Sequence, residues 1–153
     1  MGKFIGIAKK FFDSVSFKSE VEGDWLTCCL STPSGGDYRV EVVEDTTNDI
    51  FRVTFQETIY VPCDYRRDLA DYFTRCNCQL AFGHFELDME EGKIQFRFSQ
   101  WLQPEPVSAE FFGNMIVCAA NTIDYYRTGY MQIVYCDQTA SNAYEYCQKS
   151  GTK

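Results

Sequence analysis

The sequence predicts an α+β fold in which helices pack against an antiparallel β-sheet. Runs in which apolar and polar residues alternate, as in strands with one buried face, follow one another across short turns. Other stretches carry apolar residues every three or four positions, as in amphipathic helices. The expected order of elements is α-β-β-β-β-α-β-β-α, followed by a second, shorter C-terminal helix. Residues 1–153 show no internal repeat and no long linker, so we interpret them as a single domain.

The first element is a helix over residues 3–15, whose lysines lie off its apolar stripe. That stripe consists of Phe4, Ala8, Phe11, Phe12 and Val15. Two roles are open for this helix. It can pack on the sheet, or it can dock on a membrane surface or a partner.

Four strands are expected next, separated by short, turn-rich segments. They cover residues 17–22, 25–31, 38–44 and 51–61. In the third strand Tyr38, Val40 and Val42 share one face. The short separators are those of a meander, in which consecutive strands pair.

The centre of the chain, residues 61–97, predicts a helix followed by a hairpin. Pro62 suits the start of the helix, and Asn77 is expected to end it in a left-handed conformation. Leu69, Tyr72 and Phe73 form the apolar stripe, and we expect the charged residues to face water. Those charged residues are Arg66, Arg67, Asp68 and Asp71. Alternating runs over residues 85–90 and 94–99 then flank a turn that contains Gly92.

A long helix follows Pro104 and Pro106, which enforce an extended connection. Ser108 is expected to cap this helix. If it continues to Val134, it is about 40 Å long, which is longer than a domain of this size needs to cover its sheet. A second short helix over residues 138–148 then either folds back on the long one or extends it.

Residues 61–97 also resemble a known family. The segments that carry the resemblance are Val61-Pro62, the amphipathic helix, Asn77, Gly83-His84-Phe85-Glu86-Leu87-Asp88, Gly92-Lys93-Ile94 and Phe96-Arg97. In this order they resemble the YbjN family, in which a helix ends at an asparagine and a G-x-F-x-h-D strand, a turn glycine and a return strand follow. The match continues through Ser108 to Tyr126, with weaker support upstream to about Phe17, so that it covers roughly two thirds of the chain.

The resemblance implies a fold similar to that of type III secretion chaperones, and a non-enzymatic binding or regulatory role. Members of the family are described mostly as proposed bacterial sensory-transduction regulators. The chain departs from the family pattern in its eight cysteines, which are many for such a domain.

Composition excludes several classes of function. The chain has 14 basic and 22 acidic residues and a net charge of −8, which disfavours binding to nucleic acid. No apolar run approaches the ~20 residues that span a bilayer, and no signal peptide is recognisable. Gly6 stands where a myristoylation motif requires serine or threonine. We therefore expect a cytoplasmic protein without a membrane partner.

The cysteines do not form a metal-binding pattern. Cys28 and Cys29 are adjacent, so in a strand they point to opposite faces, and no pair has the spacing of a zinc knuckle. Most of the cysteines are expected to be buried free thiols. Cys76 and Cys78 are the candidates for a redox role, because we expect a loop to expose them.

No catalytic machinery is recognisable, and we expect neither an enzyme nor a bound cofactor. His84 is the only histidine, so a histidine-based triad or a two-histidine metal site cannot form within one chain. A structural, hydrogen-bonded role is the expectation for this residue. The sequence also lacks the phosphate-binding, dinucleotide-binding and nucleophile-elbow motifs.

The expected function is therefore protein binding, as a chaperone-like homodimer or as a regulatory adaptor that holds a peptide against the sheet. Tyrosine is concentrated in the C-terminal third, and this residue is enriched at interfaces. The candidate partner or dimer surface on the long helix consists of Phe112, Ile116, Ile123, Tyr126 and Tyr130. Ordinary core packing is the alternative for these residues. A small-molecule-sensing module with a pocket between sheet and helices is the second candidate function, and a thiol redox protein is the third.

Overall fold

The computed structural model describes residues 2–151 and contains the elements in the expected order. The helices are α1 (Lys3–Ser14), α2 (Arg66–Asn77), α3 (Ala109–Cys136) and α4 (Ala140–Ser150), with a 3-10 turn, η1 (Cys63–Tyr65), before α2. The strands are β1 (Ser19–Glu22), β2 (Trp25–Ser31), β3 (Asp37–Asp45), β4 (Ile50–Tyr60), β5 (His84–Leu87) and β6 (Lys93–Trp101). The α+β class and the order of elements predicted from the sequence are confirmed.

All six strands form one antiparallel sheet in the order β1-β2-β3-β4-β6-β5. The hairpin of β5 and β6 joins the meander through β6, which pairs with β4. Helix α2 therefore connects β4 to β5, two strands that are separated in the sheet by β6. Strands β1 and β5 are the edges of the sheet.

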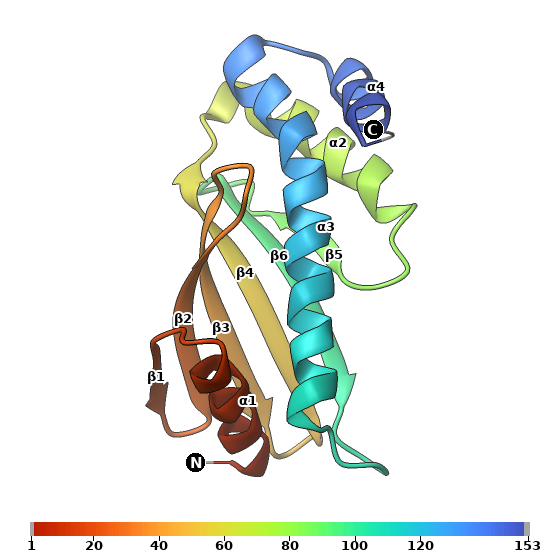
Figure 1. Cartoon of the computed structure of the whole chain (residues 1–153). Coiled ribbons are helices and arrows are strands. Elements are labelled where there is room, and N and C mark those ends of the chain that lie inside the picture. Colours follow the sequence, from red (N-terminus) through yellow and green to blue (C-terminus); the bar gives the residue numbers. More distant parts are fainter. Residues whose placement is uncertain (1, 152–153) are drawn as a thin grey trace.

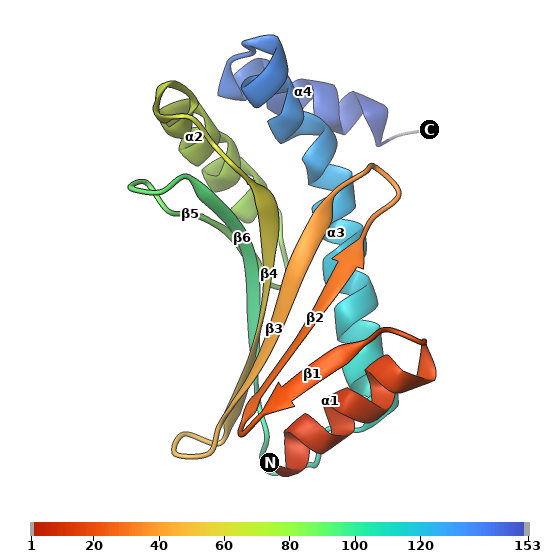
Figure 2. The ribbon, with the colours of Figure 1, turned by 90° about the vertical axis from the view of Figure 1, so that its left-hand side faces the viewer.

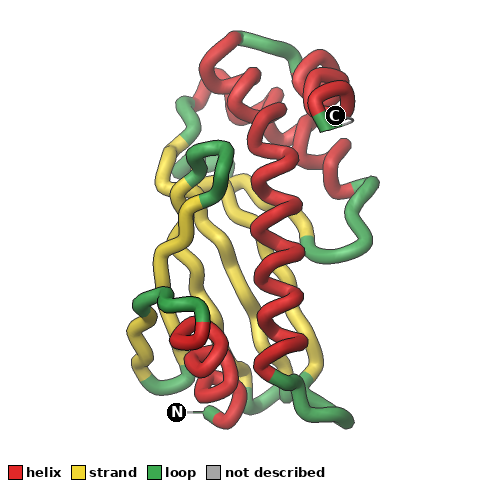
Figure 3. The backbone as a smooth tube through the Cα atoms, viewed as in Figure 1, coloured by secondary structure: helices red, strands yellow, loops and turns green. Residues whose placement is uncertain are grey.

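Helices α1 and α3 cover one face of the sheet and leave the other face without a helix (Figures 1, 2 and 3). Large aromatic residues fill the space between these layers. The ring of Phe4 stacks on that of Phe51 with centroids 3.9 Å apart, and Phe112 meets both rings edge-on. Of the two roles considered for the N-terminal helix, packing on the sheet is the one that the structure shows. We call the opposite side the helix-free face.

Helix α3 has 28 residues and is therefore about 42 Å long, and it extends beyond the end of the sheet (Figure 1). Helices α2 and α4 pack around its overhanging part. Asp137 ends α3 in the left-handed conformation, with φ 54°, and α4 then turns back toward α2. The hydroxyl of Tyr72 on α2 donates a hydrogen bond of 2.8 Å to the carbonyl of Tyr126 on α3. The overhang that the sequence predicts is thus covered by the chain itself.

Two expectations about α2 are wrong. Helix α2 ends at Asn77 as expected, but Asn77 is not left-handed, and Cys78 follows it with φ −62°. The side chain of Asn77 instead holds β5 through hydrogen bonds to both backbone groups of Phe85. Arg66 does not simply face water, since its guanidinium donates hydrogen bonds to the carbonyls of Val61, Met89 and Glu90. It thereby clamps the start of α2 to the turn between β5 and β6.

Candidate functional site

The helix-free face is built by every second residue of each strand. Along β3 and β4, residues of one parity are buried under α1 and α3, while those of the other parity are exposed or half-buried, apart from Thr54, which is only 8% exposed. Because successive side chains of a strand point to opposite sides, the strand pairing fixes which residues are neighbours on this face. Thr27, Glu41, Thr54, Arg97 and His84 form one such row across five strands.

Both tryptophans of the chain lie on this face and are exposed. Trp25 is 48% and Trp101 65% solvent-exposed. Trp25 pairs with Val43, and Trp101 pairs with Ile50 in the strand register. Val43 pairs with Arg52 and Ile50 with Asp45, so Val43 and Ile50 are diagonal neighbours. The two tryptophans, Val43 and Ile50 thus form an oblique line across β2, β3, β4 and β6, which we call the apolar line. Large aromatic residues in such positions are typical of protein-binding surfaces, where they supply much of the contact energy.

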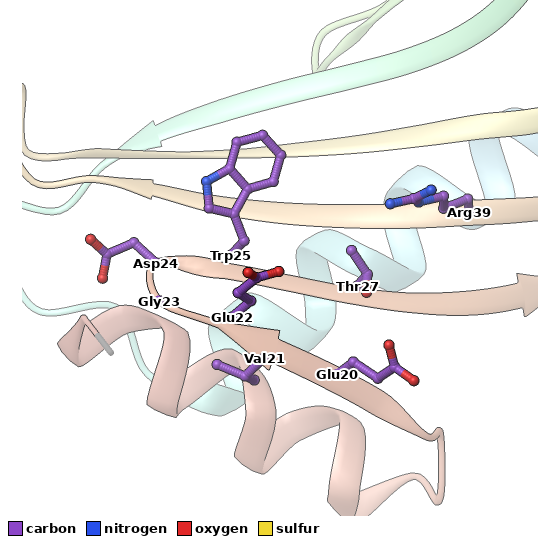
Figure 4. A pocket seen from close by; sticks show the side chains of 8 residues that line it. All are labelled: Glu20, Val21, Glu22, Gly23, Asp24, Trp25, Thr27 and Arg39. Carbon is purple, nitrogen blue, oxygen red and sulfur yellow. The ribbon is translucent and has the colours of Figure 1, made fainter.

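A hollow of about 890 Å³ lies beside Trp25, at the edge of the sheet formed by β1 and β2 (Figure 4). The Trp25 ring points away from α1, and the acidic residues Glu20, Glu22 and Asp24 line the same hollow. Arg39 is the basic residue of the lining, and it forms an ion pair of 3.1 Å with Glu41. The hollow therefore combines an aromatic ring with an excess of negative charge, which favours a cationic side chain.

A second hollow, of about 450 Å³, lies along the apolar line at Val43 and Ile50. Two arginines, Arg52 and Arg97, line it together with Asp45. Hydrogen bonds from Asn48 and Thr47 lower the pKa of Asp45, so its carboxylate is already engaged. The helix-free face is thus acidic at its β1 edge and more basic toward its centre, a pattern suited to a chain segment rather than to one small ion.

The five residues of the expected partner surface do not lie on the surface. Phe112, Ile116, Ile123, Tyr126 and Tyr130 are all buried in the core of the chain. Their stripe faces the sheet and the helices around the overhang of α3, so the alternative of core packing is the one observed. A partner surface on α3 must therefore use other residues of this helix.

A buried polar network explains why a tyrosine tolerates this core position. The Tyr130 hydroxyl donates to a carboxylate oxygen of Glu57 at 2.5 Å, and the Tyr38 hydroxyl lies 3.1 Å from that of Tyr130. Arg127 Nε lies 3.5 Å from the same Glu57 oxygen. Burial, followed by the nearby Tyr38 and Glu57, raises the pKa of Tyr130 well above its ordinary value.

Sequence reasoning missed this network, although one signal for it exists. Phe51, Val53 and Phe55 alternate onto the core face of β4, and Glu57 is the next residue in phase. A carboxylate at a core position requires a hydrogen-bonding partner. That partner, Tyr130, is distant in sequence. The alternation in β4 therefore indicates that Glu57 needs a hydrogen-bond donor but does not identify the donor.

The two candidate redox thiols differ in environment. Helix α2 continues through Cys76, which is fully buried and lies in the core rather than in an exposed loop. Burial raises the pKa of the Cys76 thiol to about 12, which opposes thiolate chemistry at neutral pH. Cys78 is exposed. The structure therefore does not bring Cys76 and Cys78 together as an exposed pair. All eight cysteines are free, but only three of them are buried, so the expectation that most are buried is wrong.

Metal-ligating side chains do not gather within residues 2–151, where no three of histidine, cysteine, aspartate and glutamate are placed to hold one ion. None of the helices in this part of the chain has the length and apolar character that crossing a bilayer requires. The single histidine, His84, lies on the exposed edge strand with its Nε2 2.8 Å from Glu86. The structural role expected for it is consistent with this hydrogen bond.

Comparison with known proteins reveals similarity in fold. No family model matches the chain, and no curated protein matches it in sequence. Among solved structures, E. coli YbjN, a candidate transcription regulator, superposes with a TM-score of 0.62 at 13% identity, covering 78% of this chain and 85% of YbjN. The HopA1–SchA chaperone–effector complex gives a TM-score of 0.49 at 13% identity, covering 77% of this chain and 88% of the matched chain. The YbjN-like fold expected from the sequence is confirmed.

Proposed function

We propose that this chain is a non-enzymatic protein-binding domain that holds a segment of a partner protein against its helix-free face. The observation that carries the proposal is the exposure of both tryptophans on that face. A protein gains little by leaving two such side chains in water, whereas a bound segment would remove their rings from it. The role is that of a chaperone or a regulatory adaptor, and the likeness in fold to YbjN supports the second of these.

The chemistry of the face specifies what the bound segment should look like. Apolar side chains would lie along the line from Trp25 to Trp101, and a lysine or arginine would enter the acidic hollow beside Trp25. An extended segment presents side chains to one side about every 6.4–6.8 Å, which is close to the spacing of about 7–8 Å between diagonal neighbours on a sheet. The preferred partner segment is therefore an extended one with both apolar and basic residues.

The proposed location of the protein is the cytoplasm. Five of the eight free cysteines are exposed, namely Cys29, Cys63, Cys78, Cys118 and Cys136. Exposed thiols persist in a reducing compartment and are oxidised outside it. This placement also suits a chaperone or adaptor that meets unfolded or extended segments of other proteins.

An array of immobilised peptides of varied sequence tests the proposal. The chain should bind a subset that combines aromatic or aliphatic residues with lysine or arginine. Replacing Trp25 by serine should abolish this binding, while Tyr135→Ser, at an exposed aromatic residue on α3, should leave it unchanged. Binding that survives both Trp25→Ser and Trp101→Ser would show that the helix-free face is not the site.

A further inference from the structure

Helix α3 has a second face, which points away from the sheet. Between Glu110 and Asp124 its exposed residues are Phe111, Asn114, Val117, Cys118 and Asn121, and we call these five the outer face of α3. Phe111 is 50% and Val117 is 53% exposed. Within this set Phe111, Asn114, Cys118 and Asn121 follow one another at intervals of three, four and three residues. That spacing is the one by which helices pack along a shared seam.

The outer face of α3 is free of charge, which is unusual for the exposed side of a helix. From residue 111 to residue 123 there is no aspartate, glutamate, lysine or arginine, although 24% of the whole chain is charged. Solvent-facing sides of helices are normally charged or strongly polar. Acidic residues bound this stretch at both ends: Glu110, which is exposed, precedes it, and Asp124, which accepts a hydrogen bond from the amide of Ser34, follows it.

We propose that the outer face of α3 binds the same face of a second copy of this chain. This proposal rests on the proposed function in one respect, since it joins two copies of the proposed protein-binding domain. The distribution of charge favours a second copy over an unrelated protein.

The chain carries a net charge of −8, so two copies repel each other over most of their surfaces. In a two-fold dimer each patch meets itself, and a charged residue near the axis is therefore placed close to its own like charge. An uncharged patch is the surface on which an acidic protein can meet its own copy at the lowest electrostatic cost. The outer face of α3 satisfies this condition over more than three helical turns.

The polar residues of this face are also able to pair with themselves. Asn114 and Asn121 each carry a donor and an acceptor in one side-chain amide. In a two-fold arrangement such amides can hydrogen-bond across the seam without burying an unpaired group. Asparagine at the seam of paired helices sets register at some cost in stability, which fits a dimer of moderate affinity.

The position of the outer face leaves the helix-free face open in the dimer. Helix α3 covers one side of the sheet, and Trp25 lies on the other (Figures 2 and 4). A dimer joined through α3 would therefore present two helix-free faces on its two outer sides. Two such faces could bind two segments of one partner, which raises the apparent affinity through effective concentration.

The test is the molecular mass in solution, by light scattering across a dilution series with reductant present. The unmodified chain should change from dimer to monomer on dilution. Val117→Glu places one charge on the outer face and should weaken the dimer at least tenfold. Met89→Glu is the matched control, because Met89 is 46% exposed but lies in the turn between β5 and β6. Asn121→Arg provides a second disruptive variant in case Val117→Glu alters folding, which circular dichroism would reveal.

Two results would overturn the proposal. One is an unmodified chain that is monomeric at every concentration. The other is a dimer that both Val117→Glu and Asn121→Arg leave as strong as the control. Binding of the Val117→Glu monomer to the peptide array separates this test from that of the proposed function, because the helix-free face is intact in that variant.

Discussion

The hydroxyl of Tyr130 on α3 donates a hydrogen bond of 2.5 Å to the carboxylate of Glu57 on β4, inside the protein. Since the single hydroxyl proton of Tyr130 points to Glu57, the Tyr38 hydroxyl at 3.1 Å is the donor of the next hydrogen bond. The long helix is thus tied to the sheet by a charged group that the core has enclosed. Arg127 extends the connection, because it forms an ion pair with Glu57 and its Nη1 donates a hydrogen bond to the carbonyl of Ser34 in the turn between β2 and β3.

We predict that Tyr130→Phe destabilises the chain by roughly 1.5–3 kcal/mol, the range for a hydrogen bond to a charged group. The ring remains in the core, but the carboxylate of Glu57 loses its nearest donor. Urea unfolding of the two proteins measures this difference. Tyr135→Phe, at an exposed position of the same helix, should change stability by less than about 0.5 kcal/mol. Equal effects of the two substitutions would show that the network contributes nothing specific.

Asn77 supports the edge strand β5 in a similar way. Its side-chain amide donates to the carbonyl of Phe85 at 3.0 Å and accepts from the Phe85 amide at 2.8 Å. We predict that Asn77→Ala costs about 1–3 kcal/mol, because both backbone groups then lose their partner. Hydrogen exchange at the Phe85 amide should become faster. Asn77→Asp keeps the acceptor, so it should protect that amide better than alanine does, and the reverse order would contradict this account.

Thiol labelling should divide the cysteines of the native protein into two groups. Cys29, Cys63, Cys78 and Cys136 are exposed and should react with a maleimide, whereas Cys28, Cys76 and Cys147 are buried and should react only after unfolding. Cys118 should react in the monomer and become protected as the dimer forms. Peptide mapping by mass spectrometry distinguishes these sites. Rapid labelling of Cys76 at neutral pH would contradict the burial that raises its pKa to about 12.

Stability should fall at alkaline pH. Burial raises the pKa of Tyr126 and of Cys76, each to about 12, and it also raises the pKa of Tyr130. A group whose pKa is higher in the folded state stabilises the protein fully below its unfolded pKa, and this contribution is lost as pH rises through the folded value. The midpoint of urea unfolding should therefore decline between about pH 9 and pH 12. A midpoint that stays constant over this range would contradict the assignment.

The sequence predicts the elements of this fold well because their faces are periodic. The alternation in Tyr38, Val40 and Val42 places all three in the core, where they are buried. Ser108 was expected to cap the long helix, and its hydroxyl oxygen accepts a hydrogen bond from the amide of Phe111. Capping and alternation are local, so they can be read from neighbouring residues.

The partner surface could not be predicted in the same way. Periodicity identifies Ile123 and Tyr126 as apolar positions on one side of a helix, but it does not show what covers them. The sheet, α2 and α4 do so, and α4 turns back through the left-handed Asp137. The exposure of Trp25 could have been predicted from the sequence, because Trp25 is in phase with Thr27 and Cys29 on the polar side of its strand.

The tryptophan fluorescence of the chain tests the central claim most directly, because both tryptophans lie on the helix-free face. A peptide selected on the array should be titrated into the protein while emission and acrylamide quenching are recorded. Our account predicts a shift of emission to shorter wavelength and weaker quenching, as the peptide removes Trp25 and Trp101 from water. A peptide that binds with neither change would show that protein binding takes place on another surface.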